Sequence, residues 1–150
     1  MSRYAIGFSP EAQFIAKRTA SGKQRLRDSN VFGLSTPLRT ELGEVWSECQ
    51  VANWDGNGAE PVSHEALHET YCFLESLPLG FPPPSVGAEP DGAMTLEWYF
   101  GRSRTLSISL AGDGELHYAA LVGANATHGT ELFDGVFPPT FVAILRRIAN

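Results

Sequence analysis

The sequence predicts an α+β fold, a two-layer sandwich in which an antiparallel meander of three or four strands carries helices on one face. Two observations lead to this prediction. Apolar residues recur at helical spacing before Pro78 and again after Pro138. Between Pro84 and Gly123 they alternate with polar residues instead, which is typical of strands with one buried face. The order of the elements is helices, then a meander, then a helix. This order is typical of a two-layer α+β fold rather than of a fold with a parallel sheet.

Three helices follow from start signals and apolar spacing. Thr36-Pro37 opens a helix that we expect to end near Gln50, and Ser63 is the N-cap of a second helix that stops before Pro78. A third starts at residues 138–140 and ends with basic side chains that suit the negative end of its dipole. The apolar stripes are Leu38, Leu42, Val45, Trp46 and Cys49; Ala66, Leu67, Thr70, Tyr71, Phe73, Leu74 and Leu77; and Phe141, Ile144, Leu145 and Ile148.

The strands are predicted between turn signals. We expect a short strand at residues 85–88, a turn at 89–92 and further strands at 94–100, 105–110 and 116–122. Residues 111–114, Ala-Gly-Asp-Gly, give the strongest hairpin signal. Residues 123–135, which include His128 and Glu131, are expected to form a loop.

Composition and charge divide the chain in two. The 150 residues suit a single folded domain, and 43% are hydrophobic. Residues 1–30 hold six basic and two acidic side chains, a net +4, whereas residues 31–150 hold five and fifteen, a net −10. We therefore expect residues 1–35 to be a basic arm or linker with a short helix at 9–18, and residues 36–150 to be one α+β domain. The arm's basic cluster is Lys17, Arg18, Lys23, Arg25 and Arg27.

The expected compartment is the cytoplasm of a bacterium. No apolar run approaches the roughly 18–20 residues that span a bilayer, and the first residues lack the apolar core of a secretory signal. Cys49 and Cys72 fall on predicted helix faces, so two buried thiols are favoured over a disulfide.

Two glycine-rich motifs flank the middle of the chain, at residues 53–61 and 89–98. Each places tight-turn residues beside a tryptophan, Trp54 or Trp98. The structural interpretation makes the tryptophans buried anchors and the glycines turn residues. The functional interpretation makes the first loop a ligand or partner surface, because such loops allow close approach to the backbone. The candidates for that surface are Trp54, Asp55, Gly56, Asn57 and Gly58, together with His128 and Glu131.

The two motifs resemble those of a family of small uncharacterised bacterial proteins with W-D-G-x-G-A-x-P followed by P-D-G-x-x-x-L-E-W. The resemblance lies on Trp54 to Pro61 and on Pro90 to Trp98, and it covers about residues 50–120. It implies no activity and no site residues. It implies a gene context among mobile or defence-type genes, and with it a defence or toxin–antitoxin setting.

No catalytic constellation is evident in the sequence. There is no G-x-S-x-G elbow and no phosphate-binding glycine motif, and the acids and histidines show no metal-ligand spacing. His64 and His68 are four apart on a predicted helix, where solvated histidines are commoner than ligands. We expect no catalytic residues, no metal and no cofactor. The eligible metal ligands are Asp55, Asp91, Glu97, His117, His128 and Glu131.

The favoured function is a non-enzymatic interaction module that binds another protein, of the accessory, immunity or antitoxin-like kind. The sequence leaves association into a homodimer open. It also leaves open a metal-assisted hydrolase that uses His128, Glu131 and Asp55, and nucleic-acid binding through the basic arm. The acidic body itself would repel nucleic acid.

Overall fold

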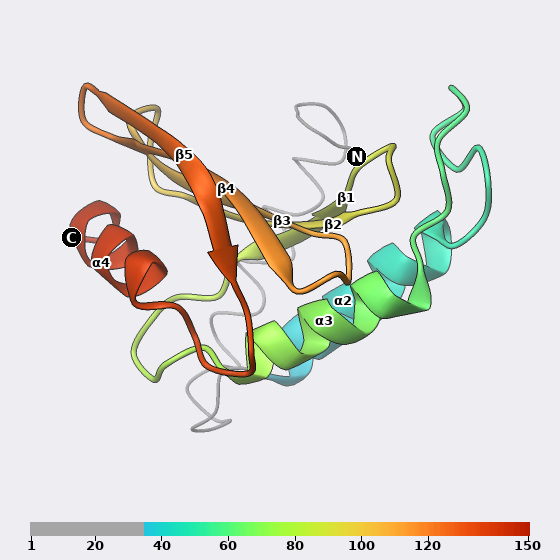
Figure 1. Ribbon diagram of the computed structural model, residues 1–150, viewed down its shortest axis with the longest axis horizontal. Helices are drawn as coiled ribbons and strands as arrows, with labels where there is room; N and C mark the ends of the chain where they lie inside the picture. The colour runs from blue at the N-terminus through green and yellow to red at the C-terminus, as the bar shows by residue number, and fades with distance from the viewer. Residues whose placement is uncertain (1–34) are drawn as a thin grey trace.

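A computed structural model describes residues 35–150, which form one sheet and the helices that cover it (Figure 1). The predicted basic arm, its five basic candidates and the helix at 9–18 lie outside the described residues. In chain order the elements are α2 (Thr36–Cys49), α3 (His64–Glu75), β1 (Ser85–Ala88), β2 (Met94–Tyr99), β3 (Arg104–Leu110), β4 (Glu115–Val122), β5 (Asn125–Leu132) and α4 (Pro139–Ile148).

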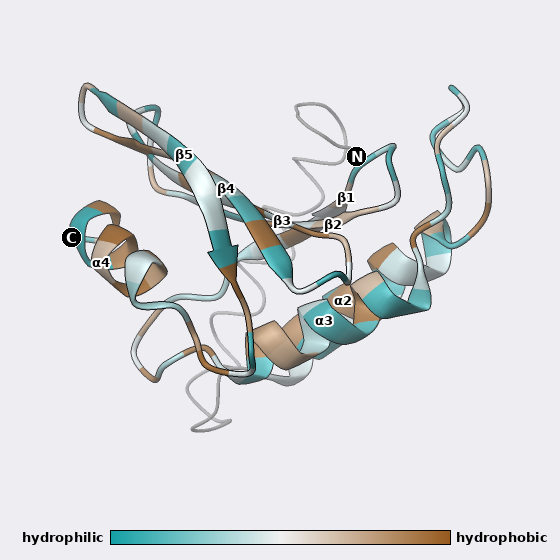
Figure 2. Cartoon of the chain, in the orientation of Figure 1, coloured by the Kyte–Doolittle hydropathy of each residue, from teal (hydrophilic) through white to brown (hydrophobic). Residues whose placement is uncertain are grey.

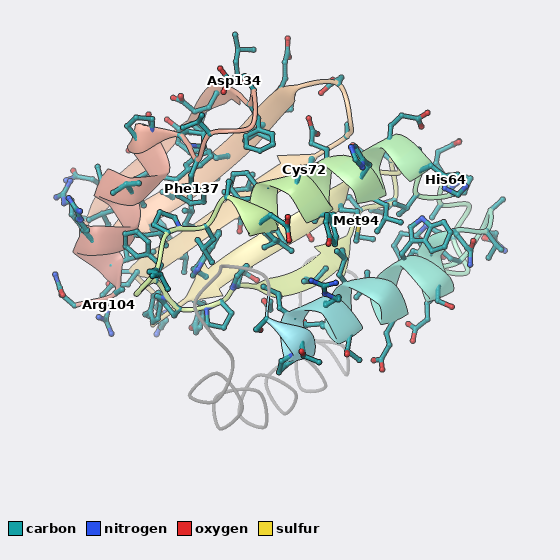
Figure 3. The ribbon with its side chains drawn as sticks, turned by 90° about the horizontal axis from the view of Figure 1, so that it is seen from below. His64, Cys72, Met94, Arg104, Asp134 and Phe137 are labelled. Atoms are coloured by element: carbon teal, nitrogen blue, oxygen red, sulfur yellow. The ribbon has the colours of Figure 1, made fainter. Side chains whose placement is uncertain are left out.

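The sheet is an antiparallel meander with strand order β1-β2-β3-β4-β5. The described helices share one hydrophobic core with one face of the sheet, so the predicted two-layer α+β fold is confirmed. Figure 3, seen from the helix side, shows α2 and α3 running side by side in front of the sheet. The sheet has five strands rather than three or four.

The fifth strand corrects the expected loop at residues 123–135. Val122 pairs with Asn125, so residues 123 and 124 form a two-residue turn in which Gly123 has a φ of 65°. Glycine at the first position of a two-residue turn is a hairpin signal that sequence reasoning could have used. The apolar alternation is missing because the core-face positions of β5 are Asn125, Thr127, Gly129 and Glu131, and Gly129 lies under the ring of Tyr118. A Cβ at Gly129 would be 3.0 Å from the Tyr118 hydroxyl oxygen, so a neighbouring side chain fills this position of the core face.

Ser63 is the N-cap of α3 as predicted, and Ser35, just before the predicted start at Thr36, is the N-cap of α2. The Ser63 hydroxyl accepts a hydrogen bond from the Ala66 amide at 3.0 Å, and that of Ser35 accepts one from Leu38 at 3.4 Å. α3 ends at Glu75, two residues before Leu77, which is the last residue of the predicted stripe. Ser76 is its C-cap. No helix within residues 35–150 is both long enough and apolar enough to cross a membrane.

The core lies between the helices and the sheet. Trp98 is 2% exposed, and its indole Nε1 donates to the Pro82 carbonyl at 2.8 Å, which fixes the proline-rich connector to the sheet. Phe73 of α3 packs against Phe137 and Phe141 with ring centroids 5.0 and 6.0 Å away, which ties α3 to α4. Met94 and Phe137 are labelled in this layer in Figure 3.

Candidate functional site

The two glycine-rich motifs lie against each other. The Glu60 amide donates to the Pro90 carbonyl at 2.7 Å, and a Cβ at Gly92 would be 3.0 Å from the Pro61 carbonyl oxygen. Gly92 has a φ of 95°, which L side chains rarely adopt. The second motif thus needs glycine both for its turn and for contact with the first.

The first loop uses its own backbone donors. Asp55 Oδ1 accepts from the amides of Asn57 at 2.8 Å and Ala59 at 3.1 Å. Asn53 Oδ1 accepts from the Gly58 amide at 2.6 Å, and the Gly56 amide donates to the Asn53 carbonyl. Because these amides are bonded within the loop, they are not free to hold an anion, and the loop's glycines and Asp55 have a folding role.

The two tryptophans differ in burial. Trp98 is the buried anchor that the sequence predicted, whereas Trp54 is half-buried. The Trp54 indole donates to the Glu60 carbonyl at 2.8 Å across the loop. The side chain of Asn57 is exposed, so partner contact at this loop would fall to Asn57 and the outer part of the Trp54 ring.

The residues proposed for metal-assisted hydrolysis are not brought together. His128 pairs with Ala119 on the face of β5 that points away from the helices. Glu131 pairs with Leu116 on the helix face, where its carboxylate accepts from the Thr140 hydroxyl at 2.9 Å. Asp55 belongs to the loop that contacts the β1–β2 turn, whereas β5 forms the opposite edge of the sheet. Within the described part of the chain, no three His, Cys, Asp or Glu residues are placed to hold a metal ion.

The remaining histidines and cysteines are also dispersed. The ring of His64 lies tilted against that of Trp46, with ring centroids 5.2 Å apart. His68 Nε2 lies 3.5 Å from the Cys72 sulfur, one turn along α3. Neither cysteine is disulfide-bonded. Cys49 is buried as expected, whereas Cys72 is only half-buried.

The surface that no described helix covers is the second face of the sheet, which we call the open face. It carries the side chains that alternate with the core residues, and it is mostly hydroxylated or acidic. Strand register places four rows across it. These rows are Ser85, Glu97, Ser107, Ala119 and His128; Gly87, Thr95, Ser109, His117 and Thr130; Tyr99, Thr105, Leu121 and Ala126; and Glu115 with Leu132.

A polar cluster lies at one end of the open face. The Ser109 hydroxyl donates to Glu89 Oε1 at 3.0 Å, and Ser109 pairs directly with His117 of β4. His117 Nδ1 lies 3.0 Å from the Thr130 hydroxyl, and its Nε2 is 3.9 Å from the Glu115 carboxylate. Sequence reasoning did not single out Glu89, Ser109 or Thr130, because only the strand register brings them beside His117. The serine donates to the acid rather than to the imidazole, so the cluster lacks the activated hydroxyl of a nucleophilic triad.

Two carboxylates of this face have raised pKa values. Burial raises the pKa of Glu89, and the nearby charge of Asp91 adds to it, while the Ser109 hydrogen bond and His117 oppose the shift. Burial also raises the pKa of Glu97. No arginine of the described residues occupies an open-face strand position, and no lysine occurs after Lys23. The face is therefore acidic at neutral pH.

The chain matches no protein-family model, and comparisons with curated proteins and with solved structures likewise give no significant match.

Proposed function

We propose that this chain is a non-enzymatic interaction module whose open face binds a basic segment of another protein. The observation that carries the proposal is the five-stranded face that no element of residues 35–150 covers, with acids Glu89, Glu97 and Glu115 and no arginine or lysine among its strand positions. Complementary charge would bring a basic partner to this face and orient it.

The chemistry of the face supports binding rather than turnover. Its hydroxyl groups lie on rigid strands and offer hydrogen bonds to a partner's backbone, side chains or bridging water. Tyr99 is 62% exposed and lies in the same row as Leu121, which supplies apolar contact area beside the acids. Exposed tyrosine is enriched at protein interfaces. The same properties would suit an accessory, immunity or antitoxin-like protein of a bacterial cell.

A titration with a defined probe tests the proposal. A fluorescent 15-residue peptide rich in arginine is titrated against the full chain, and binding is followed by anisotropy. The variant pair Glu97→Lys/Glu115→Lys should weaken binding by about tenfold or more, because both acids lie on the open face. The matched pair Glu48→Lys/Glu75→Lys changes the net charge equally at exposed positions of α2 and α3.

The comparison of the two pairs decides the outcome. If the helix pair weakens binding by less than about threefold, the open face is the binding surface. Equal losses from both pairs would show attraction to net charge alone and would contradict the proposal. Binding of an acidic peptide or of a DNA oligonucleotide in preference to the basic peptide would also contradict it.

A further inference from the structure

The two edge strands of the sheet differ in whether their outer backbone hydrogen-bonding groups are blocked. β1 has four residues, follows Pro84 and contacts α2. The buried carboxylate of Glu41 accepts a hydrogen bond from the Val86 amide at 3.0 Å. A side chain thus occupies a backbone donor in the middle of this edge, which blocks the addition of another strand.

The opposite edge, β5, has no such protection from the described part of the chain. Its eight residues pair with β4 in unbroken register, without a bulge, and it contains no proline, lysine or arginine. Within residues 35–150, no backbone hydrogen bond joins the outer side of β5 to another element. Figure 2 shows the strand mostly in white and teal, with brown at its end. A long, regular and weakly charged edge is a template for a further strand.

We propose that β5 pairs with β5 of a second copy of this chain, antiparallel and about a two-fold axis beside Gly129. Such pairing joins two five-stranded sheets and leaves both open faces on the same side. Because each copy offers the same row of donors and acceptors in opposite directions, the contact is self-complementary and closes on itself.

The side chains of β5 select the register. With Gly129 opposite Gly129 of the second copy, Leu132 lies opposite Ala126 of the second copy. Ala126 pairs with Leu121 of the same hairpin. Ala126 and Leu121 of one copy would therefore both contact Leu132 of the other copy. Leu132 is 75% exposed and Leu121 is 37% exposed in the single chain, which makes this an apolar contact available for burial.

The same register also keeps the ionisable side chains of the two copies apart. His128 lies opposite Thr130 of the second copy, and Glu131 lies opposite Thr127 of the second copy. A shift by one residue in each strand would place His128 opposite its own counterpart and would leave Leu132 opposite Ala124, beyond the strand. A self-complementary pattern favours a second copy over an unrelated extended segment.

Charge exchange between the paired positions tests the register. Sedimentation velocity of the full chain gives the dimer dissociation constant for the wild type, Leu132→Lys, Ala126→Glu and the double variant. Each single variant should raise this constant by about tenfold or more, because a charge is placed in an apolar contact. The double variant should restore it to within about threefold, because lysine and glutamate then lie opposite each other in both symmetric contacts.

The rescue is specific to association between copies. Positions 126 and 132 are six residues apart in one strand, about 20 Å at the usual rise, and cannot pair within a chain. Val51→Lys is the control, since Val51 is 57% exposed in the α2–α3 connection and should leave the constant unchanged. Leu132→Thr repeats the test without a charge, and thermal melting checks that each variant folds.

Three results would overturn the proposal. The first is a wild-type chain that stays monomeric at concentrations up to about 0.2 mM. A dimer that forms only above this concentration would have too low an affinity to be specific. The second is a dimer that neither single variant weakens. The third is a double variant that dissociates as readily as the singles, which would show that Ala126 and Leu132 do not meet. None of these results depends on whether the open face binds a basic partner.

Discussion

Two glycines of the β3–β4 hairpin have the same backbone conformation and different surroundings. Gly112 and Gly114 have φ values of 89° and 85°. A Cβ at Gly112 would be 2.5 Å from a backbone carbon of Glu65, whereas nothing lies within 4 Å of one at Gly114. Gly114→Ala should therefore lower the free energy of unfolding by about 1–2 kcal/mol, the strain of a left-handed residue. Gly112→Ala should lower it by about 3 kcal/mol or more, because α3 must shift.

Urea unfolding of the two variants measures the difference. Equal losses of unfolding free energy would mean that the hairpin does not dock on α3 as described, and that only backbone strain matters at Gly112.

Two tryptophans differ in whether their indole N–H group has a hydrogen-bond partner. The Trp46 Nε1 is buried without a hydrogen-bond partner among residues 35–150, whereas that of Trp98 donates to the Pro82 carbonyl. Trp46→Phe removes an unsatisfied donor and should change the unfolding free energy by less than about 1 kcal/mol. Trp98→Phe leaves the Pro82 carbonyl unpaired and should lower it by about 2–3 kcal/mol. A larger loss for Trp46→Phe in thermal melts would show that its N–H is bonded in solution.

At the scale of elements, one carboxylate joins α3 to the β3–β4 hairpin. Glu69 accepts from the Gly112 amide through one oxygen and from the Gly114 amide through the other, both at 2.8 Å. Glu69→Ala leaves two amides without this partner and should lower the unfolding free energy by about 1–3 kcal/mol. Glu75→Ala, at an exposed position of the same helix, should change it by less than about 0.5 kcal/mol. Equal urea midpoints for the two variants would exclude the proposed link.

Elements with strong local signals were predictable from sequence, and contacts between distant segments were not. Ser63 and the 111–114 turn carry their structure in neighbouring residues, so α3 and the β3–β4 hairpin were predicted correctly. β5 was missed because its core-face positions carry no apolar side chain, and at Gly129 the ring of Tyr118, on another strand, fills the space instead.

The same distinction applies to the candidate site. Alternation predicted a polar sheet face, but not that Glu89 would meet Ser109, twenty residues away, beside His117. That contact requires the register of three strands. The turn chemistry of Asp55 was predicted, whereas its use of the loop's own amides could be seen only in the folded chain.

For the whole molecule, the acidic face makes stability depend on pH. Burial raises the pKa of both Glu89 and Glu97 above the ordinary value for a glutamate. The folded state therefore favours their protonated forms, and stability present below the unfolded pKa is lost as the pH rises through the folded values. Glu89→Gln/Glu97→Gln should have a higher unfolding free energy than the wild type at pH 7, and the difference should vanish near pH 4.

Urea unfolding between pH 4 and pH 8 measures this difference, with Glu75→Gln as a control for the loss of an exposed acid. A double variant that is less stable at pH 7 would show that the ionised carboxylates stabilise the fold, and the assigned direction of both shifts would be wrong.

The division of charge along the chain leads to the last prediction. Residues 1–30 have a net charge of +4 and the rest of the chain −10, so the arm is itself a basic segment tethered to an acidic domain. A tethered segment competes at an effective concentration that reaches about millimolar for a short flexible connection. Deletion of residues 1–30 should therefore tighten binding of the arginine-rich peptide to the open face. The gain should shrink as salt rises, because exposed charges are screened over about 8 Å at physiological ionic strength.

The truncated chain is first melted to establish cooperative unfolding, and anisotropy titrations with the peptide are then run at two salt concentrations for both chains. Weaker peptide binding by the truncated chain would show that the arm contributes to the binding surface rather than competing for it. A loss of cooperative unfolding would show instead that the arm belongs to the folded core, and the boundary near residue 35 would have to move towards the N-terminus.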